Sequence, residues 1–416
     1  MLVKYFAFLS FGLLLSSAAI AQTQNDLIVT KLNDKLFKFS IGEDPHSTNM
    51  VASIGEDGVL LVDTGYKQYG SALKKELALL DDSLPNLIIN THLHTDHTGN
   101  NDSFENDPII IAHRNVQRDM VEGRYMLRGL SSGSKPNIVV SDPISIFFNG
   151  EEIKLIPVPG SHSDGDMIVY FTKSKIVVTG DIGYGMKYPS YDLLNGNSAL
   201  YAQAAQTVLE STDEDVMYIS GHGKDLQRED MEKWSEMLAK TTNVIQQEME
   251  KGKDFETIQK ENEFIEWQSF EEGYNTKDSW IKNVYLSIEN PGRSPALIPA
   301  VFNVYESEGI DEAIKKFHEV KQEIKREDII AFNLQTLSTI IYDEGEGEID
   351  DAIAILKILV KDYSGNERIW VNYANLGNLY MKKDMFDLAK KFLKMSMEIH
   401  PTEYASNRLE EIEDKE

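Results

Sequence analysis

Apolar and polar positions divide the chain into two parts of different character. Between residue 28 and about residue 223, short apolar runs alternate with polar loops and with stretches in which apolar residues recur at helical spacing. From about residue 225 onwards the short runs disappear, and apolar, acidic and basic residues all follow helical spacing. We therefore predict an α/β structure with helices covering sheets for the first part and an all-α structure for the second.

The apolar runs of the first part predict its strands, which cover residues 36–39, 58–65, 87–91, 108–112, 153–158, 167–171, 176–179 and 216–220. The run at 167–171 is joined to the next by a tight polar turn, so these two should form a hairpin. The turn at 98–100 is expected to open a helix. Helical spacing predicts further helices over residues 71–80, 115–126 and 198–209.

The last part of the chain, from about residue 296, contains an internal repeat. Its most regular unit has the residues typical of a tetratricopeptide repeat, namely Tyr373, Leu376, Gly377, Tyr380, Ala389, Leu393 and Pro401. An earlier unit includes Leu337, Ala352 and Leu356, and a weaker one includes Ala313 and Phe317. Each unit should be a helix pair that buries its apolar face against the next pair, and a generic helical bundle is the alternative.

The first 21 residues have the pattern of a secretory signal peptide. Lys4 precedes an apolar run from Phe6 to Leu15, and Ala19-Ile20-Ala21 is a small-x-small cleavage site. A membrane-spanning helix needs about 20 apolar residues, and this run is shorter. We expect cleavage after Ala21 and a mature chain without a membrane span, either periplasmic or extracellular. An uncleaved anchor is the alternative.

Composition excludes several classes of partner and chemistry. The formal net charge of -27 opposes binding to the phosphate backbone, so we expect no nucleic-acid partner. The chain has no cysteine, which excludes disulfides, thiolate metal ligands and cysteine nucleophiles.

The segment His92-Leu93-His94-Thr95-Asp96-His97 carries the clearest chemical signal. It holds three of the nine histidines of the chain together with a carboxylate, directly after a predicted strand. Zinc favours imidazole nitrogen and carboxylate oxygen as ligands. A histidine-rich polar loop without function is the alternative, but chance rarely concentrates histidine in this way. The segment therefore predicts a metal site at the end of a strand.

Three further candidate ligands, His162, Asp181 and His222, also follow predicted strands. Each signal is weak alone, because Gly180-Asp181 and Gly221-His222-Gly223 are ordinary turn sequences. Together with the histidine segment, however, they occupy equivalent positions on loops after strands. Such loops can build one site at one edge of a sheet.

These residues resemble the five motifs of the metallo-β-lactamase superfamily, over residues 28 to about 240. In motif order they are Asp63, the group His92, His94, Asp96 and His97, then His162, Asp181 and His222. The resemblance implies an αβ/βα sandwich with a metal site at the sheet edge. Within the superfamily the chain is similar to a secreted branch described as glyoxalase II-like or cyclase-like.

The resemblance also implies a dinuclear centre. The first metal would be held by His92, His94 and His162, and the second by Asp96, His97 and His222. Asp181 would bridge the two. Two zinc ions are expected, with iron and manganese as alternatives, because a mixed His/Asp site does not choose strongly among these metals.

The same resemblance implies roles for other residues. A hydroxide bridging the metals would be the nucleophile, and Asp96 would be the catalytic residue that orients it and moves its proton. Asp63 would accept a hydrogen bond from a ligand imidazole or a loop amide. Tyr184 and Lys187, on the loop after Asp181, are candidate contacts to the substrate.

The sequence thus favours a secreted dinuclear zinc hydrolase that cleaves a small-molecule ester, lactone, thioester or lactam. A β-lactamase is an alternative, although a bridging Asp181 resembles the glyoxalase II, lactonase and phosphodiesterase branches more closely. A metal-containing binding protein with a peptide-docking array is the other alternative. The expected divisions are the signal peptide 1–21, a hydrolase domain 22–240, a helical connecting segment 241–295, and tetratricopeptide-like repeats 296–416, through which a protein or peptide partner could bind.

Overall fold

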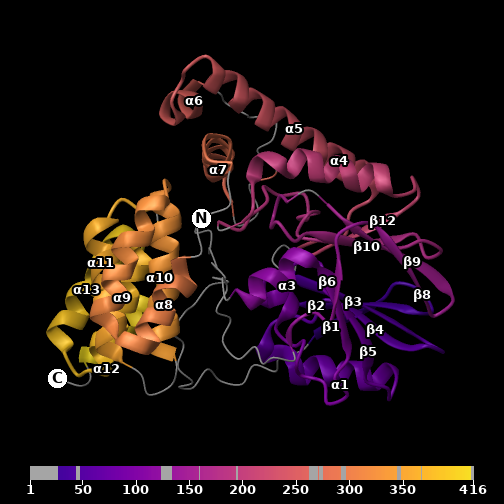
Figure 1. Ribbon diagram of the computed structural model, residues 1–416, viewed down its shortest axis with the longest axis horizontal. Helices are drawn as coiled ribbons and strands as arrows, with labels where there is room; N and C mark the ends of the chain where they lie inside the picture. Colours follow the sequence, from indigo (N-terminus) through magenta and orange to yellow (C-terminus); the bar gives the residue numbers. More distant parts are fainter. Residues whose placement is uncertain are drawn as a thin grey trace. The chain divides into compact units, whose positions relative to one another are not determined.

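The computed structural model describes residues 27–43, 47–122, 134–158, 160–193, 195–261, 270, 275–291, 297–343, 348–366 and 368–413. The expected signal peptide, residues 1–21, lies outside these ranges. By their contacts, the described residues up to Pro291 form one compact unit, and those from Leu297 onwards form a second. Both units are drawn in Figure 1.

The first unit contains two β-sheets. The larger has the order β1 (Leu27–Lys31), β2 (Leu36–Ile41), β3 (Thr48–Gly55), β4 (Gly58–Val62), β5 (Pro85–Ile89), β6 (Ile109–His113) and β7 (Ile138–Val140). It is antiparallel from β1 to β4 and parallel from β4 to β7. The smaller has the order β12 (Met217–Ser220), β11 (Ile176–Gly180), β10 (Met167–Phe171), β9 (Glu151–Pro157) and β8 (Ile144–Phe148).

Alternating apolar residues pack the two sheets face to face. Leu60 and Val62 of β4 belong to the core shared with the smaller sheet, whereas Leu61 points to the opposite side. In β10, Val169 joins the shared core and Tyr170 points outward. Since successive side chains of a strand point to opposite faces, β4 and β10 are buried on both faces, and both sheets need helices outside them.

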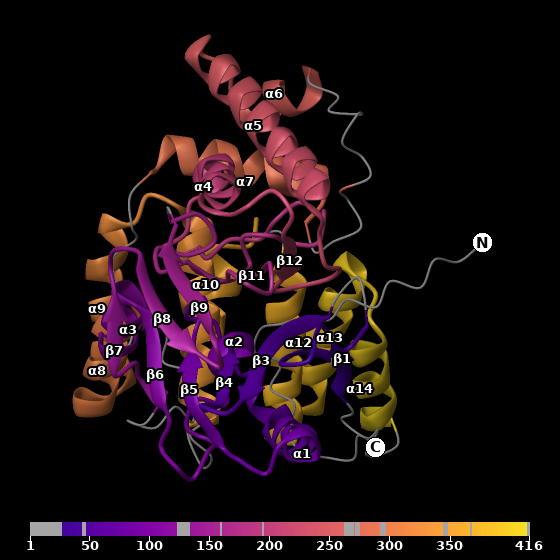
Figure 2. The same ribbon diagram turned by 90° about the vertical axis from the view of Figure 1, so that its right-hand side faces the viewer.

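Helices cover the two outer faces. Helix α1 (Gly70–Leu80) buries Leu73 and Leu77 against the larger sheet, and the short helix α3 (Arg114–Val121) packs beside β6 and β7. Three helices, α4 (Tyr201–Ser211), α5 (Arg228–Glu250) and α7 (Lys277–Glu289), share a core cluster with the outer face of the smaller sheet. They gather on one side of the strands, next to α6 (Phe255–Glu261) (Figure 2). This is the predicted αβ/βα sandwich.

Each apolar run that predicted a strand forms one, and the 167–171 run pairs with the next as a hairpin. The prediction of a helix opening at 98–100 is wrong. The helical turn there, α2 (Thr95–Thr98), lies inside the histidine segment and ends at Thr98. Asn100 then bonds through Nδ2 to the carbonyl oxygens of Thr64 and Tyr66, at 2.8 and 2.7 Å. An asparagine side chain that bonds the backbone in this way favours a turn over a helix.

The described residues of the predicted connecting segment, 241–295, pack into the first unit. Helix α5 runs without a break across residue 240, and α7 buries Trp280 completely. Trp280 stacks on Tyr188 and lies edge-on to Tyr201, with ring centroids 6.2 and 6.1 Å away. Its neighbour in the same core is Trp234 of α5. Both tryptophans are packing anchors of this core.

The second unit is helical wherever it is described, which confirms the all-α prediction. Its helices are α8 (Leu297–Glu308), α9 (Ile310–Val320), α10 (Glu327–Asp343), α11 (Ile349–Asp362), α12 (Ile369–Lys382), α13 (Phe386–Ile399) and α14 (Glu403–Glu413). Neighbours in sequence pack as the pairs α8/α9, α10/α11 and α12/α13. At the last pair the helices approach so closely that a Cβ on Gly377 would lie 2.6 Å from Leu393 Cγ. In the described part of the chain, no helix is both long and apolar enough to cross a membrane.

Two truncations test whether the helices after residue 240 belong to the first unit. A chain ending at Arg293 should unfold in one sharp thermal transition, because the first core is complete. A chain ending at Glu250 loses Trp280 and the rest of α7, and each large buried side chain contributes about 3–5 kcal/mol. It should melt far lower or not fold, as measured by circular dichroism. Equal melting temperatures for the two chains would contradict this packing assignment.

Candidate metal centre

Strand direction brings the candidate ligands to one edge of the sandwich. Asp63 follows β4 and His92 follows β5, which run parallel. His162, Asp181 and His222 follow β9, β11 and β12. These three strands also share a direction, because β10 is antiparallel to β9 and β11, and β11 is parallel to β12. The sheets are joined at this edge by a hydrogen bond of 2.9 Å from Met167 N to Thr91 O.

All seven predicted ligands meet there in two adjoining clusters. The first consists of His92, His94, His162 and Asp181, and the second of Asp96, His97 and His222. Within each cluster, one donor atom from every residue lies within 4.8 Å of the others. Asp181 contacts both clusters, since its Oδ1 lies 3.3 Å from His97 Nε2 and its Oδ2 lies 3.3 Å from His162 Nε2.

Hydrogen bonds on the outer side of each ring determine which nitrogen carries the proton. The Thr91 hydroxyl donates to Asp63 Oδ2 at 2.8 Å, so the His92 Nδ1–H must be the donor to Thr91 Oγ1 at 3.1 Å. His97 Nδ1 donates to the same carboxylate oxygen of Asp63 at 2.8 Å. The neutral forms of His92 and His97 therefore present the lone pair of Nε2 to the centre.

The same reasoning holds for the other three rings. His162 Nδ1 donates to Ser190 O at 2.9 Å, and His222 Nδ1 donates to Ser47 O at 3.2 Å. His94 is turned the other way: its Nε2 donates to Asp192 Oδ2 at 2.9 Å, and its Nδ1 faces the centre. Five imidazole lone pairs and two carboxylates thus converge on one region.

This arrangement fits a pair of metal ions. Four donors at about 2.0–2.1 Å from one ion in tetrahedral directions lie roughly 3.4 Å apart. His94 Nδ1 lies 3.2 Å from His92 Nε2 and 2.9 Å from His162 Nε2, while Asp96 Oδ2 lies 3.1 Å from His222 Nε2. His97 Nε2 and Asp181 Oδ1 are buried and have no hydrogen-bond partner. Buried polar atoms are seldom left so, and a cation would satisfy both.

The electrostatics of the centre also favour positive charge. Burial lowers the pKa of His162 to about 4 and holds the pKa of His92 well below its ordinary value. Burial would lower the pKa of His222 as well, but the carboxylates of Asp181 and Asp96 outweigh it and raise that pKa to about 9. Without a metal, protons on imidazole rings balance the buried carboxylates, so protons and metal ions compete for the same nitrogens.

Asp63 binds the histidine segment and the residue before it through its carboxylate. It is fully buried and accepts bonds from the Thr91 amide and hydroxyl and from His97 Nδ1. Its φ of 62° lies in the left-handed region, where a residue other than glycine is strained by about 1 kcal/mol or more. Thr64 N then donates to His97 O at 2.8 Å. The sharp turn after β4 therefore holds the histidine segment against the end of the strand.

A close approach of two loops needs glycine at residue 221. A Cβ there would collide with Asp181 Oδ1 and with the main chain of Gly180. Gly221 N donates to Gly180 O at 2.8 Å, so the loops after β11 and β12 are in direct contact. The glycine that made Gly221-His222-Gly223 look like an ordinary turn is what lets His222 reach Asp181.

The centre is buried except at one side. The side chains of His94 and Asp96 are 17% and 12% exposed, whereas those of His97 and Asp181 are 0% and 3% exposed. His94 and Asp96 therefore mark the side from which a substrate could approach.

Sequence reasoning missed Asp192, whose buried carboxylate binds His94. It lies in an irregular segment after Pro189 and does not follow a strand, so nothing distinguishes it from the other acidic residues of the chain. Ser190 and Tyr201, which contact His162 Nδ1, were missed for the same reason.

The two candidate substrate contacts are less accessible than loop residues usually are. Tyr184 is 3% exposed, and its ring centroid lies 5.3 Å from that of His222. Its hydroxyl accepts a hydrogen bond from Ser190 Oγ at 3.0 Å. Lys187 is 6% exposed, and its carbonyl oxygen accepts a bond from Trp234 Nε1 at 2.8 Å. Tyr184 thus lies beside the second cluster.

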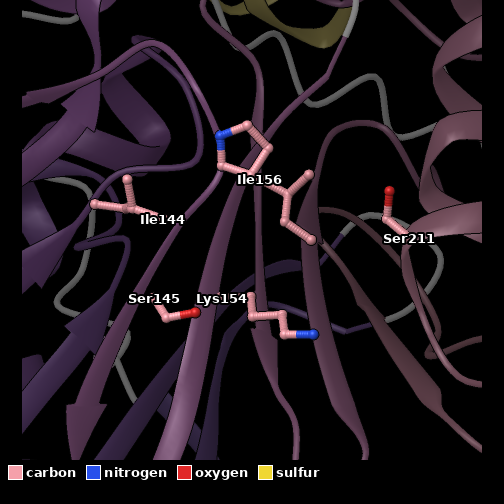
Figure 3. Close-up of a pocket in the computed structure, with 6 residues that line it drawn as sticks. Ile144, Ser145, Lys154, Ile156 and Ser211 are labelled. Atoms are coloured by element: carbon pink, nitrogen blue, oxygen red, sulfur yellow. The ribbon is translucent and has the colours of Figure 1, made fainter.

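A separate surface pocket of about 340 Å³ lies between β8, β9 and the end of α4 (Figure 3). Its lining residues are Pro143, Ile144, Ser145, Lys154, Ile156 and Ser211. None of the seven clustered ligands lines it, and Lys154 is its one ionisable side chain. We therefore place the chemistry at the metal centre and not in this pocket.

The fold and this site define a class, namely metal-binding α/β sandwich proteins with a His/Asp centre at the sheet edge. Residues 41–234 match the family model described as the metallo-beta-lactamase superfamily. This part of the chain therefore resembles the superfamily that the five motifs predict, and it has the αβ/βα fold of that superfamily.

Two curated relatives are similar to part of the chain. The chain is 26% identical over 187 residues to the probable metallo-hydrolase YqgX of Bacillus subtilis (strain 168), covering 43% of this chain and 86% of that protein. It is 23% identical over 159 residues to an uncharacterized protein of Aquifex aeolicus (strain VF5), covering 37% of this chain and 75% of that one.

Solved structures similar to the chain include a metallo-beta-lactamase from Pontibacter korlensis and one from Hirschia baltica. The first is 15% identical, with a TM-score of 0.44, and covers 51% of this chain and 99% of its own. The second is 19% identical, also with a TM-score of 0.44, and covers 51% of this chain and 98% of its own.

The position of Asp181 between the clusters leads to a direct test. Asp181→Ala should lower the metal content and reduce the hydrolysis rate by at least about 100-fold, because both clusters lose a shared anionic donor. His113→Ala is the control: His113 is the last residue of β6 and caps α3 by accepting a bond from Asn115 N at 3.3 Å. If His113→Ala inactivates the protein and Asp181→Ala does not, the assignment of the centre is wrong.

Proposed function

We propose that the protein is a secreted dinuclear zinc-dependent hydrolase that cleaves a carboxyl-type bond of a small molecule, in an ester, lactone, thioester or lactam. The observation that carries the proposal is the sharing of Asp181 between two donor clusters, with distances of 3.3 Å to His97 Nε2 and to His162 Nε2. A closed structural site would be complete with four ligands, whereas this one has seven donors and a solvent-facing side.

Two bound metals would supply Lewis acidity and lower the pKa of a water to about neutral. The chain itself supplies orientation and proton transfer. Burial opposes ionisation of Asp96, but His97 and His222 outweigh it and hold the pKa of Asp96 below its ordinary value. As an ionised and partly exposed carboxylate, Asp96 can accept a proton from an attacking water and return it to the leaving group.

Asp63 and Asp192 contribute without contacting the substrate. They accept the outer N–H of His97 and His94 at 2.8 and 2.9 Å, which keeps the lone pairs of both rings directed into the centre. Tyr184 is our candidate for contacting a substrate oxyanion, because its ring lies beside His222. Lys187, buried on the same loop, is the weaker candidate.

The donor set of the centre supports zinc as the metal, and the N-terminal sequence supports secretion. Five imidazoles and two carboxylates suit zinc, and iron or manganese remain alternatives. The signal-peptide pattern of residues 1–21 supports secretion to the periplasm or the medium.

The C-terminal helices are proposed to be tetratricopeptide-like repeats that bind a protein or peptide partner. Three sequence-adjacent helix pairs and the close approach at Gly377 support the repeat assignment. Stacked helix pairs commonly present an extended binding surface.

Metal content tests the dinuclear proposal. Elemental analysis of the mature protein should give about two metal ions per chain, with zinc the most abundant, because two donor clusters need two cations. Less than about half an equivalent, even after incubation with excess zinc, would contradict it.

A substrate panel tests the reaction class. With two metals bound, the protein should turn over aryl esters, thioesters or lactones with higher kcat/KM than a chromogenic cephalosporin, since no cysteine ligand is available. A kcat/KM above about 10⁵ M⁻¹s⁻¹ for the cephalosporin alone would favour the β-lactamase alternative. A fully loaded protein that hydrolyses nothing in the panel would favour the binding-protein alternative.

A further inference from the structure

His94 is the exceptional ring of the centre. The other four histidines face the clusters through Nε2, whereas His94 faces them through Nδ1. Its side chain, 17% exposed, is also more accessible than that of His92, His97, His162 or His222. A ring at a solvent-facing side that is not held can rotate about its Cβ–Cγ bond or exchange its tautomer. Either change would withdraw the Nδ1 lone pair.

Asp192 is the residue that holds His94. Its Oδ2 lies 2.9 Å from His94 Nε2, and its side chain is 2% exposed. A carboxylate oxygen that accepts the Nε2–H keeps the proton on Nε2 and directs the Nδ1 lone pair to the centre. Asp192 is itself tied to the next ligand, because its main-chain N donates to His162 O at 2.6 Å.

The segment that carries Asp192 is supported by residues that follow the family match, which ends at residue 234. Tyr188 N donates to Phe270 O at 3.0 Å, and Asn275 Nδ2 donates to Pro189 O at 2.8 Å. On the other side of Asp192, Ser198 N donates to Ser287 Oγ of α7 at 3.1 Å. The support thus comes from both sides of the segment and from residues outside the matched domain.

We propose that Asp192 is a positioning residue that fixes His94 for metal binding through Nδ1, and that Phe270, Asn275 and α7 hold Asp192 in place. The inference rests on the proposed metal centre and assigns a role to the helical addition that the superfamily resemblance leaves without one. The helices around α7 are then part of the machinery of the centre as well as part of the core.

Metal affinity of the full-length protein tests the role of Asp192. Asp192→Ala should weaken the binding of one zinc ion by about 10- to 100-fold, as loss of an orienting partner typically does. Asp192→Asn should lower the zinc affinity less than Asp192→Ala does, because the asparagine amide oxygen can still accept the Nε2–H of His94. Affinities are measured by competition with a chromophoric chelator. In parallel, NMR of the cadmium-loaded wild-type protein should show His94 bound through Nδ1 and the other histidines through Nε2.

Asp119→Asn is the matched control. The Asp119 carboxylate is equally buried and binds the same segment, accepting from Asn195 Nδ2 at 2.6 Å, but its bonds in the structure include none to a ligand imidazole. It should lower the melting temperature and leave both zinc affinities unchanged. If Asp119→Asn weakens zinc binding as much as Asp192→Ala does, Asp192 acts through general stability and the inference is wrong.

A second pair of variants tests the helical support. Asn275→Ala removes the bond to Pro189 O. It should lower the affinity for the same zinc ion by about fivefold, which is the effect of one lost hydrogen bond. Asn290→Ala, at the C-terminal end of α7, should leave zinc binding unchanged, because among the described residues its side chain bonds its neighbour Glu289 and not the segment that carries Asp192. If both variants bind zinc as tightly as the wild type, the contact from Asn275 does not hold Asp192 in place, and this part of the inference is wrong.

Different results would contradict the proposed function and the positioning role of Asp192. A wild-type protein that binds no metal would contradict the proposed function itself. A wild-type protein that binds two zinc ions, with Asp192→Ala binding both as tightly, would overturn the positioning role alone.

Discussion

Five imidazole lone pairs and two carboxylates cannot converge in a protein interior unless positive charge lies between them. In its neutral form, each ring of the centre gives its N–H to an outer acceptor and directs the lone pair of its inner nitrogen to the centre. Burial excludes the water that could otherwise satisfy His97 Nε2 and Asp181 Oδ1. The need for positive charge, from metal ions or from protons on the rings, therefore follows from hydrogen bonding inside this chain and does not depend on the similarity to other proteins.

The rest of the first unit serves this convergence. Strands β4, β5, β9, β11 and β12 all point their carboxyl ends to one edge, and the ligands follow them on short loops. The strained turn at Asp63 brings the histidine segment onto the end of β4, and the glycine at 221 lets His222 approach Asp181. The one ligand without such support from the strands is His94. Its partner Asp192 is carried by a segment that the later helices hold.

Apolar runs were enough to predict eight strands, because a strand buried on both faces is apolar throughout. Strand β3 was missed because buried Asn49 and Ser53 interrupt its apolar pattern. Their polar groups are satisfied by bonds to distant residues, such as Asn49 Nδ2 to Ser220 O at 2.9 Å. Strand β8 was also missed. It lies at a sheet edge, where its apolar residues Ile144 and Phe147 are exposed. The candidate ligands were predicted from the histidine segment, from positions after strands and from the superfamily resemblance. Asp192 could not be predicted in this way, since only tertiary folding brings it to His94.

Crystals of the zinc-loaded protein, measured at the zinc absorption edge, would test the central claim most directly. The account predicts two anomalous peaks about 3.5–4 Å apart at the sheet edge, with Asp181 between them. One peak should lie at bonding distance from His94 Nδ1, and the other from Asp96 and His222. A single peak enclosed by four ligands, or none after soaking in zinc, would contradict the dinuclear centre.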